Sequence, residues 1–177
     1  MSTLIEAYGL YWHADDVFWG AGSKAGSLLG VPAWARSSAP VDFRKQAGIY
    51  VLYRDHEMVY VGQAGSGRAM LFNRLKAHRK DHLADRWNRF SWFGLRKVFG
   101  NGNLGSVNQR AKATFATALD QIEGVLIAAA EPSLNKQSGK LGRGHRYLQA
   151  RDERLGPTQE EMIQAIYESL PQEEDGY

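Results

Sequence analysis

Cysteine is absent from this chain of 177 residues, and proline occurs only five times. The lack of cysteine excludes disulfides, thiolate nucleophiles, iron–sulfur clusters and cysteine-ligated zinc, so any chemistry must use oxygen and nitrogen groups. Long apolar runs are also absent: the longest, residues 125–130, is far shorter than the roughly 20 residues that span a bilayer. The first residues lack a basic flank followed by an apolar stretch. We therefore expect a cytoplasmic protein that makes no membrane contact.

The composition is that of a folded domain. Hydrophobic residues make up 44% and charged residues 23% of the sequence, which excludes a disordered or fibrous chain. The sequence divides into an aromatic, glycine-rich segment (1–41), a patterned central domain (42–135) and a C-terminal segment that is first basic and then acidic (136–177). We expect the first segment to pack on the central domain, and the last to contain a docking helix before its acidic tail.

Basic residues gather in two blocks. Residues 66–98 contain nine lysines and arginines against two aspartates, and residues 136–151 contain five against no acidic residue. Such blocks beside aromatic residues favour binding to nucleic acid, because each phosphate contact releases counterions. Solvated helix faces give the same pattern, so the charge alone does not decide. The candidates for nucleic-acid binding are Arg68, Lys76, Arg79, Lys80, Lys136, Lys140, Arg143 and Arg146.

A β-hairpin is predicted by two runs rich in β-branched and aromatic residues, 48–54 and 58–63, on either side of the turn-like residues 55–57. The length of its loop decides where Tyr50 and Tyr60 point. A three-residue loop puts both phenols on one face of the sheet, whereas a two-residue loop puts them on opposite faces.

Helices are expected to flank this hairpin. Residues 68–86 and 115–129 have helical composition or an apolar period of 3.6 residues, with a strand near 90–95 between them. Thr158 and Glu161 form a capping-box pattern before a final apolar helix. The expected fold class is α/β, in its α+β form: a small antiparallel sheet that includes the hairpin, flanked by helices, with N- and C-terminal extensions.

Three side chains on these helices have chemical potential. Arg74 and His78 are four residues apart and therefore neighbours on one helix surface. Glu123 falls within the apolar stripe of the long helix, where a carboxylate needs a partner. Each has a structural alternative, since Arg74 can be a surface residue with a buried stem, His78 a satisfied helix histidine, and Glu123 a partner in a structural ion pair.

The order of these residues resembles the GIY-YIG nuclease superfamily. Gly48-Ile49-Tyr50 is similar to the first motif of that family, and Tyr60-Val61-Gly62 to the second, with valine in place of the commoner isoleucine. Arg74 and His78 resemble its Arg-x-x-x-His helix. Glu123, Pro132 and Asn135 resemble its closing signature. The resemblance covers residues 48–135, about half of the chain, and a longer stretch before Arg74 leaves Arg68 as a second candidate for the arginine.

This resemblance implies a divalent-metal-dependent endonuclease that hydrolyses phosphodiester bonds in DNA, with RNA as an alternative substrate. Tyr50 would orient or deprotonate water with help from nearby cations or His78, Tyr60 would orient this network, and Arg74 would stabilise the transition state. Glu123 would bind one Mg²⁺ or Mn²⁺ ion. The supporting residues implied are Gly48, Gly62 and Asn135.

Two other functional classes stay open. One is a catalytically silent nucleic-acid-binding module with the same fold. The other is an accessory subunit, or a homodimer, that uses the N-terminal segment with Trp12, Trp19 and Trp34 as an interface, because exposed aromatic side chains anchor many interfaces. The sequence does not distinguish restriction, repair, mobile-element and phage-defence roles.

Overall fold

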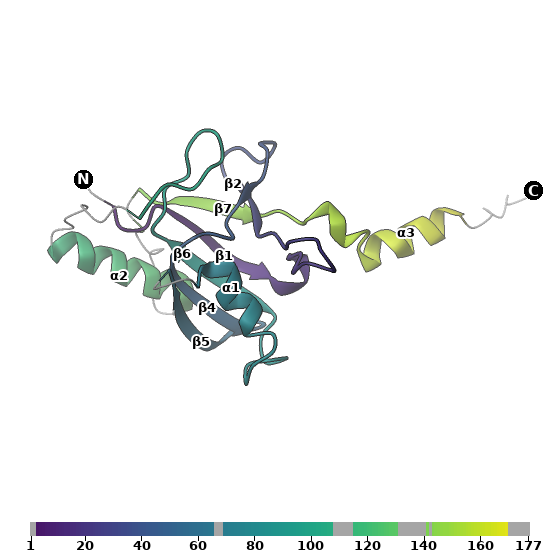
Figure 1. Cartoon of the computed structure of the whole chain (residues 1–177), viewed down its shortest axis with the longest axis horizontal. Helices are drawn as coiled ribbons and strands as arrows, with labels where there is room; N and C mark the ends of the chain where they lie inside the picture. The colour runs from purple at the N-terminus through teal and green to yellow at the C-terminus, as the bar shows by residue number, and fades with distance from the viewer. Residues whose placement is uncertain (1–2, 66–68, 108–114, 131–140, 142, 170–177) are drawn as a thin grey trace, which may run out of the picture.

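The computed structural model describes residues 3–65, 69–107, 115–130, 141 and 143–169, with side chains of the long helix described from residue 121. Its strands form a single sheet (Figure 1). In chain order the elements are β1 (Ala7–His13), the 3₁₀ turn η1 (Ala14–Asp16), β2 (Leu29–Pro32), β3 (Val41–Asp42), β4 (Gly48–Arg54), β5 (Glu57–Ala64), α1 (Leu71–Ala77), β6 (Arg89–Gly94), α2 (Phe115–Ala130), β7 (His145–Gln149), the 3₁₀ turn η2 (Glu153–Leu155) and α3 (Gln159–Ser169).

The sheet has seven strands in the order β3-β2-β7-β1-β6-β4-β5. All neighbouring pairs are antiparallel except β1 and β7, which are parallel. The mixed α/β class is confirmed, but the expectation of a small antiparallel sheet is wrong. The sheet is larger because β1 and β2, before the hairpin, and β7, after the long helix, extend it beyond β6.

The two faces of the sheet carry different helices. Along β4, Tyr50 and Leu52 join a core cluster that includes Leu71, Phe72 and Leu75 of α1. Val51 and Tyr53, which point the other way, join a cluster with Ala129 of α2. We call these two sides the α1 face and the α2 face. The alternation of side chains along a strand therefore separates the two helices across the sheet.

The hairpin reaches its register through a bulge. Its turn has two residues, since Arg54 pairs with Glu57, and an unbroken ladder from that turn would put Tyr50 and Tyr60 on opposite faces. Val59 is an extra residue that shifts the ladder, so that Leu52 pairs with Tyr60 and Tyr50 with Gly62. Tyr60 therefore shares the α1 face with Tyr50. The hairpin is confirmed, and the bulge, not a three-residue loop, aligns the phenols.

The helix expected over residues 68–86 is shorter. α1 ends at Ala77, and local polar contacts redirect the chain after it. The indole N–H of Trp87 donates to the carbonyl of His78, and the Asp81 carboxylate accepts the backbone N–H of Leu83. A short acidic side chain that bonds its own backbone favours turns over helix.

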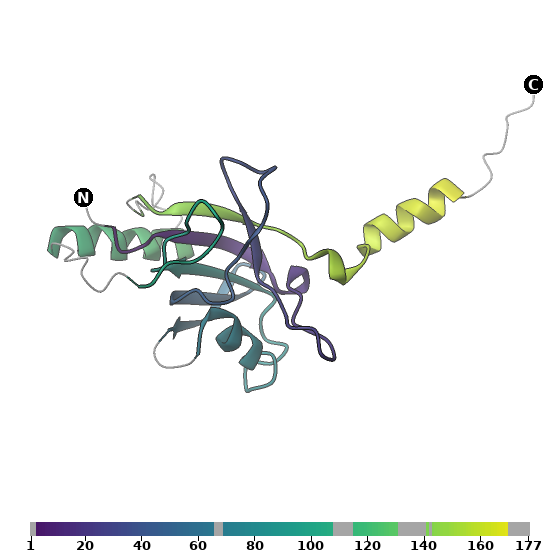
Figure 2. The ribbon, with the colours of Figure 1, turned by 45° about the horizontal axis from the view of Figure 1, so that its top comes forward.

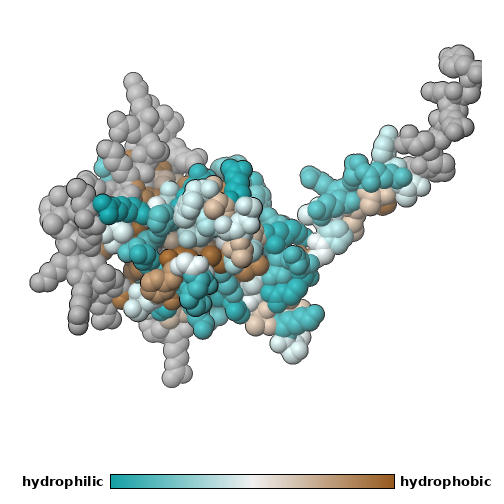
Figure 3. All heavy atoms as spheres, turned by 90° about the horizontal axis from the view of Figure 1, so that it is seen from above, coloured by the Kyte–Doolittle hydropathy of each residue, from teal (hydrophilic) through white to brown (hydrophobic). Residues whose placement is uncertain are grey.

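The C-terminal helix forms but does not dock. The backbone N–H of Thr158 donates to Glu161, and the N–H of Glu161 donates to the Thr158 hydroxyl, so the capping box is confirmed. α3 nevertheless projects away from the sheet, at the end of the molecule opposite α2 (Figure 2). Its apolar side chains lie along one side and are exposed (Figure 3). They are Met162, Ile163, Ile166 and Tyr167.

Candidate functional site

Tyr50 and His78 meet on the α1 face of the sheet. Tyr50 comes from the buried middle of β4, and His78 is the residue that ends α1. The Tyr50 hydroxyl oxygen lies 2.8 Å from Nε2 of His78. Tyr50 has no exposed surface, and His78 is 6% exposed. One proton thus lies between the phenol oxygen and the imidazole nitrogen, in a site with little access to water.

Asp81 completes this chain of contacts on the far side of the imidazole. Its Oδ2 lies 2.7 Å from Nδ1 of His78, and its Oδ1 accepts the backbone N–H of Leu83 at 2.8 Å. Burial raises the pKa of Asp81, but the hydrogen bonds from Leu83 and His78 outweigh it, so this pKa lies below its ordinary value. Asp81 is therefore a carboxylate at neutral pH.

Tyr60 and Arg74 border the Tyr50–His78 pair, and both are half-buried. The Tyr60 ring lies 4.9 Å from the imidazole and 6.2 Å from the Tyr50 ring, measured between centroids. Arg74 lies one helical turn before His78, as its spacing predicts. Its Nε is buried and has no hydrogen-bond partner within the described part of the chain. The guanidinium thus has one N–H donor that no described group accepts.

Burial and Arg74 have opposite effects on the Tyr50 hydroxyl. Burial raises the pKa of Tyr50 above its ordinary value, and the hydrogen bond and charge of Arg74 only partly offset this. The contact with Tyr50 in turn raises the pKa of Arg74. Arg74 favours the phenolate, as expected of a nearby cation, but desolvation is the larger effect. Tyr50 is a neutral phenol at physiological pH.

Glycine at two motif positions allows close packing around Tyr50. A side chain at Gly62 would collide with the ring and hydroxyl of Tyr50. One at Gly48 would collide with the backbone of Phe93, and Gly48 has a φ of +150°. These two glycines therefore serve the packing of β4 against its two neighbouring strands.

Glu123 is not brought to this cluster. Its helix packs on the α2 face, and its side chain is exposed. The expectation that it lies within the buried stripe is wrong. Gln121, 3% exposed, takes the inward position because its Oε1 accepts the backbone N–H groups of Leu4 and Ile5. As a result Ile122 is exposed.

The residues beside Tyr50 do not fit the implied metal ion. Glu123, the expected ligand, belongs to the other face, and both oxygens of Asp81 already accept hydrogen bonds. Among the described residues, no group of three or more histidine, aspartate or glutamate side chains is placed to hold a cation. We therefore assign no metal to the cluster.

The basic candidates are divided between the two faces. Lys76, Arg79 and Lys80 lie on or just after α1 and are exposed. Arg79 stacks on the ring of Trp19, 4.9 Å from its centroid. Arg146 is exposed on β7 and neighbours Tyr147, whose ring is in the α1-face cluster, so Arg146 points to the α2 face. Arg143 is exposed in the turn before β7. Arg68, Asn135, Lys136 and Lys140 lie outside the described residues.

Asp81 is the site residue that sequence reasoning missed. Its signal was its place three residues after His78, a spacing that brings two side chains together on a helix surface as well as in a turn. Searches of protein-family models, curated proteins and solved structures found no match to this chain. No helix within the described ranges is long and apolar enough to cross a bilayer.

Proposed function

We propose that the cluster of Tyr50, Tyr60, Arg74 and His78 binds a phosphodiester of nucleic acid and hydrolyses it. The observation that carries the proposal is the contact between the Tyr50 hydroxyl and His78, with the unpartnered Arg74 Nε beside it. Together they supply what phosphodiester hydrolysis needs from a protein: a fixed cation for the extra negative charge of the transition state, and a path for a proton.

Each residue has a distinct part in this proposal. Arg74 and Tyr60 are partly exposed, so they meet the phosphate first, and the planar guanidinium matches its nonbridging oxygens. Tyr50 and His78 lie behind them and move the proton of the attacking water. The exposed Lys76, Arg79 and Lys80 beside α1 hold neighbouring phosphates. The arrangement agrees with the resemblance to GIY-YIG nucleases at the tyrosines, the arginine and the histidine, but not at Glu123.

One observation favours a second candidate, a nucleic-acid-binding module without catalysis. Tyr50 has no exposed surface, so water contacts its hydroxyl only if Tyr60 or Arg74 shifts. If neither shifts on binding, the Tyr50–His78 pair only fixes the position of Arg74. The two candidates differ in whether bound nucleic acid is cut.

The deciding experiment is a cleavage and binding panel. Labelled single-stranded, duplex, flap and junction DNA, and RNA, are incubated with the full chain in Mg²⁺, Mn²⁺ or chelator at low salt. We expect at least one substrate to be cut. Tyr50→Phe should then lower the single-turnover cleavage rate by about 10²-fold or more, the scale for loss of a proton-transfer group.

Tyr167→Phe is the matched control. It removes the same hydroxyl group from a residue that is 67% exposed on α3, far from the cluster. It should cut as fast as the unmodified chain. Equal rates for Tyr50→Phe and the control would remove Tyr50 from the reaction. Binding of a substrate in the panel without any cleavage would overturn the hydrolase and support the binding module.

A further inference from the structure

The second nitrogen of His78 has a partner that the proposed reaction does not yet use. Asp81 is a carboxylate, and a carboxylate only accepts hydrogen bonds. The distance of 2.7 Å between Asp81 Oδ2 and His78 Nδ1 therefore requires a proton on Nδ1. A neutral imidazole carries one proton, so its Nε2 is left as an acceptor that faces the Tyr50 hydroxyl at 2.8 Å.

We propose that Asp81 is a positioning residue that fixes the tautomer of His78, so that Nε2 can take the proton of Tyr50. The inference rests on the proposed function for its consequence in catalysis, but its structural part stands on the two contacts alone. In the transfer, the O–H bond of Tyr50 breaks and an N–H bond forms at Nε2. The electron pair stays on the phenolate oxygen beside Arg74, and Asp81 faces the resulting imidazolium.

Burial explains why such a partner matters here. His78 is 6% exposed, so solvent does little to stabilise its charged form, and the Asp81 side chain, 35% exposed, connects it to the surface. The phenolate formed at the same time is beside a guanidinium. Both charges created by the transfer thus have a counter-charge in contact, which lowers the cost of separating them in a buried site.

Asp81→Asn tests this sharply, because the backbone fixes how the new amide must lie. The N–H of Leu83 needs an acceptor at the position of Oδ1, so the amide oxygen goes there and the amide NH₂ faces Nδ1 of His78. That NH₂ can only donate, which forces the imidazole proton to Nε2. The substitution should therefore invert the tautomer while keeping the shape of the side chain.

The first measurement is nitrogen NMR of the His78 imidazole in the full chain, at mildly alkaline pH where a histidine is ordinarily neutral. We expect a protonated Nδ1 in the unmodified chain and a protonated Nε2 in Asp81→Asn. Asp85→Asn is the control, since Asp85 is exposed in the same loop, whereas the carboxylate at Nδ1 of His78 is that of Asp81. It should leave the tautomer unchanged. A protonated Nδ1 retained in Asp81→Asn would overturn the inference.

The second measurement is the single-turnover cleavage rate on the best substrate of the panel. Asp81→Asn should lower it by about 10²-fold or more, as expected when a histidine base is held in the wrong tautomer, with substrate binding and the Asp85→Asn rate unchanged. Inversion without loss of rate would refute the role in catalysis. If the unmodified chain cuts nothing, the proposed function fails, and inversion of the tautomer still supports Asp81 as the residue that sets it.

Discussion

Gly62 is the residue against which the Tyr50 phenol packs. It pairs with Tyr50 across the hairpin, and an added methyl group would collide with the hydroxyl oxygen and ring of Tyr50 and with the ring of Tyr60. Because Tyr50 is fully buried, its ring cannot move aside without disturbing its neighbours, among them His78. The short contact between the phenol and the imidazole therefore depends on the absence of a side chain at position 62.

Gly62→Ala should accordingly destabilise the protein by about 1–3 kcal/mol, the range for overpacking a core. It should also separate the Tyr50 hydroxyl from His78. Urea unfolding gives the free energy, and the NMR resonance of His78 Nε2 reports the contact. Gly100→Ala is the control, because nothing lies within 4 Å of a methyl group there. Equal stability of the two variants would contradict the packing described for Tyr50.

The sequence was informative about this part of the molecule where a side chain's position follows from its own element. Arg74 and His78 were predicted to lie together from a spacing of one helical turn. Tyr50 and Tyr60 were predicted to share a face only with a three-residue loop, and it is the bulge at Val59 that puts them on one face. Asp81 was missed although it lies three residues after His78; what the spacing does not give is the end of α1, which is fixed by contacts of Trp87 and Leu83 from the following loop. Helix ends that depend on later residues carry a weak signal in the sequence itself.

A buried amide of helix α2 holds the segment that leads into β1. Gln121 Oε1 accepts the backbone N–H of Leu4 at 2.7 Å and of Ile5 at 3.0 Å, and these residues lead into β1. Near the C-terminal end of the helix, the Tyr53 hydroxyl donates to the carbonyl of Ala129 at 2.8 Å. The apolar periodicity of this helix was predicted, but its inward side was not. The two backbone N–H groups that donate to Gln121 keep it buried, whereas Ile122 beside it is exposed.

Gln121→Met keeps the size of the side chain and removes the acceptor. We expect a loss of about 2–4 kcal/mol in the free energy of unfolding, because two backbone N–H groups lose their partner. Hydrogen exchange of the Leu4 and Ile5 amides should accelerate with it. Gln63→Met, at an exposed position of β5, is the control. It should change the free energy of unfolding by no more than about 0.5 kcal/mol and leave the exchange of the two amides unchanged. Protection of the two amides in Gln121→Met would show that another group holds them.

The distribution of strands along the chain shows how the N- and C-terminal thirds become one sheet. β1 lies between β6 and β7, so strands from the beginning and the end of the chain pair with each other, and β6 joins them to the hairpin. Trp12 of β1 is 2% exposed and packs against Phe43, Phe90 and Trp92. Local patterning predicted the hairpin, β6 and the three helices but none of β1, β2, β3 and β7, whose long-range pairing has no local signal, and this explains why a small sheet was expected.

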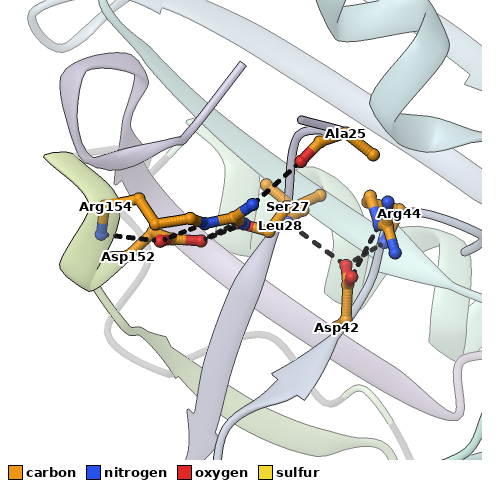
Figure 4. A network of polar contacts seen from close by, with 7 residues as sticks. All are labelled: Ala25, Ser27, Leu28, Asp42, Arg44, Asp152 and Arg154. Atoms are coloured by element: carbon orange, nitrogen blue, oxygen red, sulfur yellow. Dashed lines mark hydrogen bonds and ion pairs between the residues drawn. The ribbon is translucent and has the colours of Figure 1, made fainter. Parts of the chain in front are cut away.

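A polar network ties the C-terminal turn η2 to the loop before β2 (Figure 4). Asp152, 5% exposed, accepts hydrogen bonds from the Arg154 guanidinium and from the Ser27 hydroxyl. Arg154 also donates to the carbonyl of Ala25 and stacks over Phe18. The hydrogen bond from Arg154, followed by that from Ser27, holds the pKa of Asp152 far below its ordinary value, although burial opposes this.

The depressed pKa gives this network a defined pH dependence. The unfolded carboxyl titrates near its ordinary value of about 3.9, so the stabilisation from Asp152 is fully present above that pH and is lost as the pH falls toward the folded-state value. Asp152→Asn, which removes the charge, should lower the free energy of unfolding by about 1–2 kcal/mol at neutral pH. The deficit should shrink as the pH falls below about 4, as urea titrations at a series of pH values would show.

Asp15→Asn, at an exposed carboxylate of η1, should match the unmodified chain throughout. If the stability deficit of Asp152→Asn stays constant into acid, the charge of Asp152 does not stabilise the contact between η2 and the loop before β2, and only its side-chain shape does.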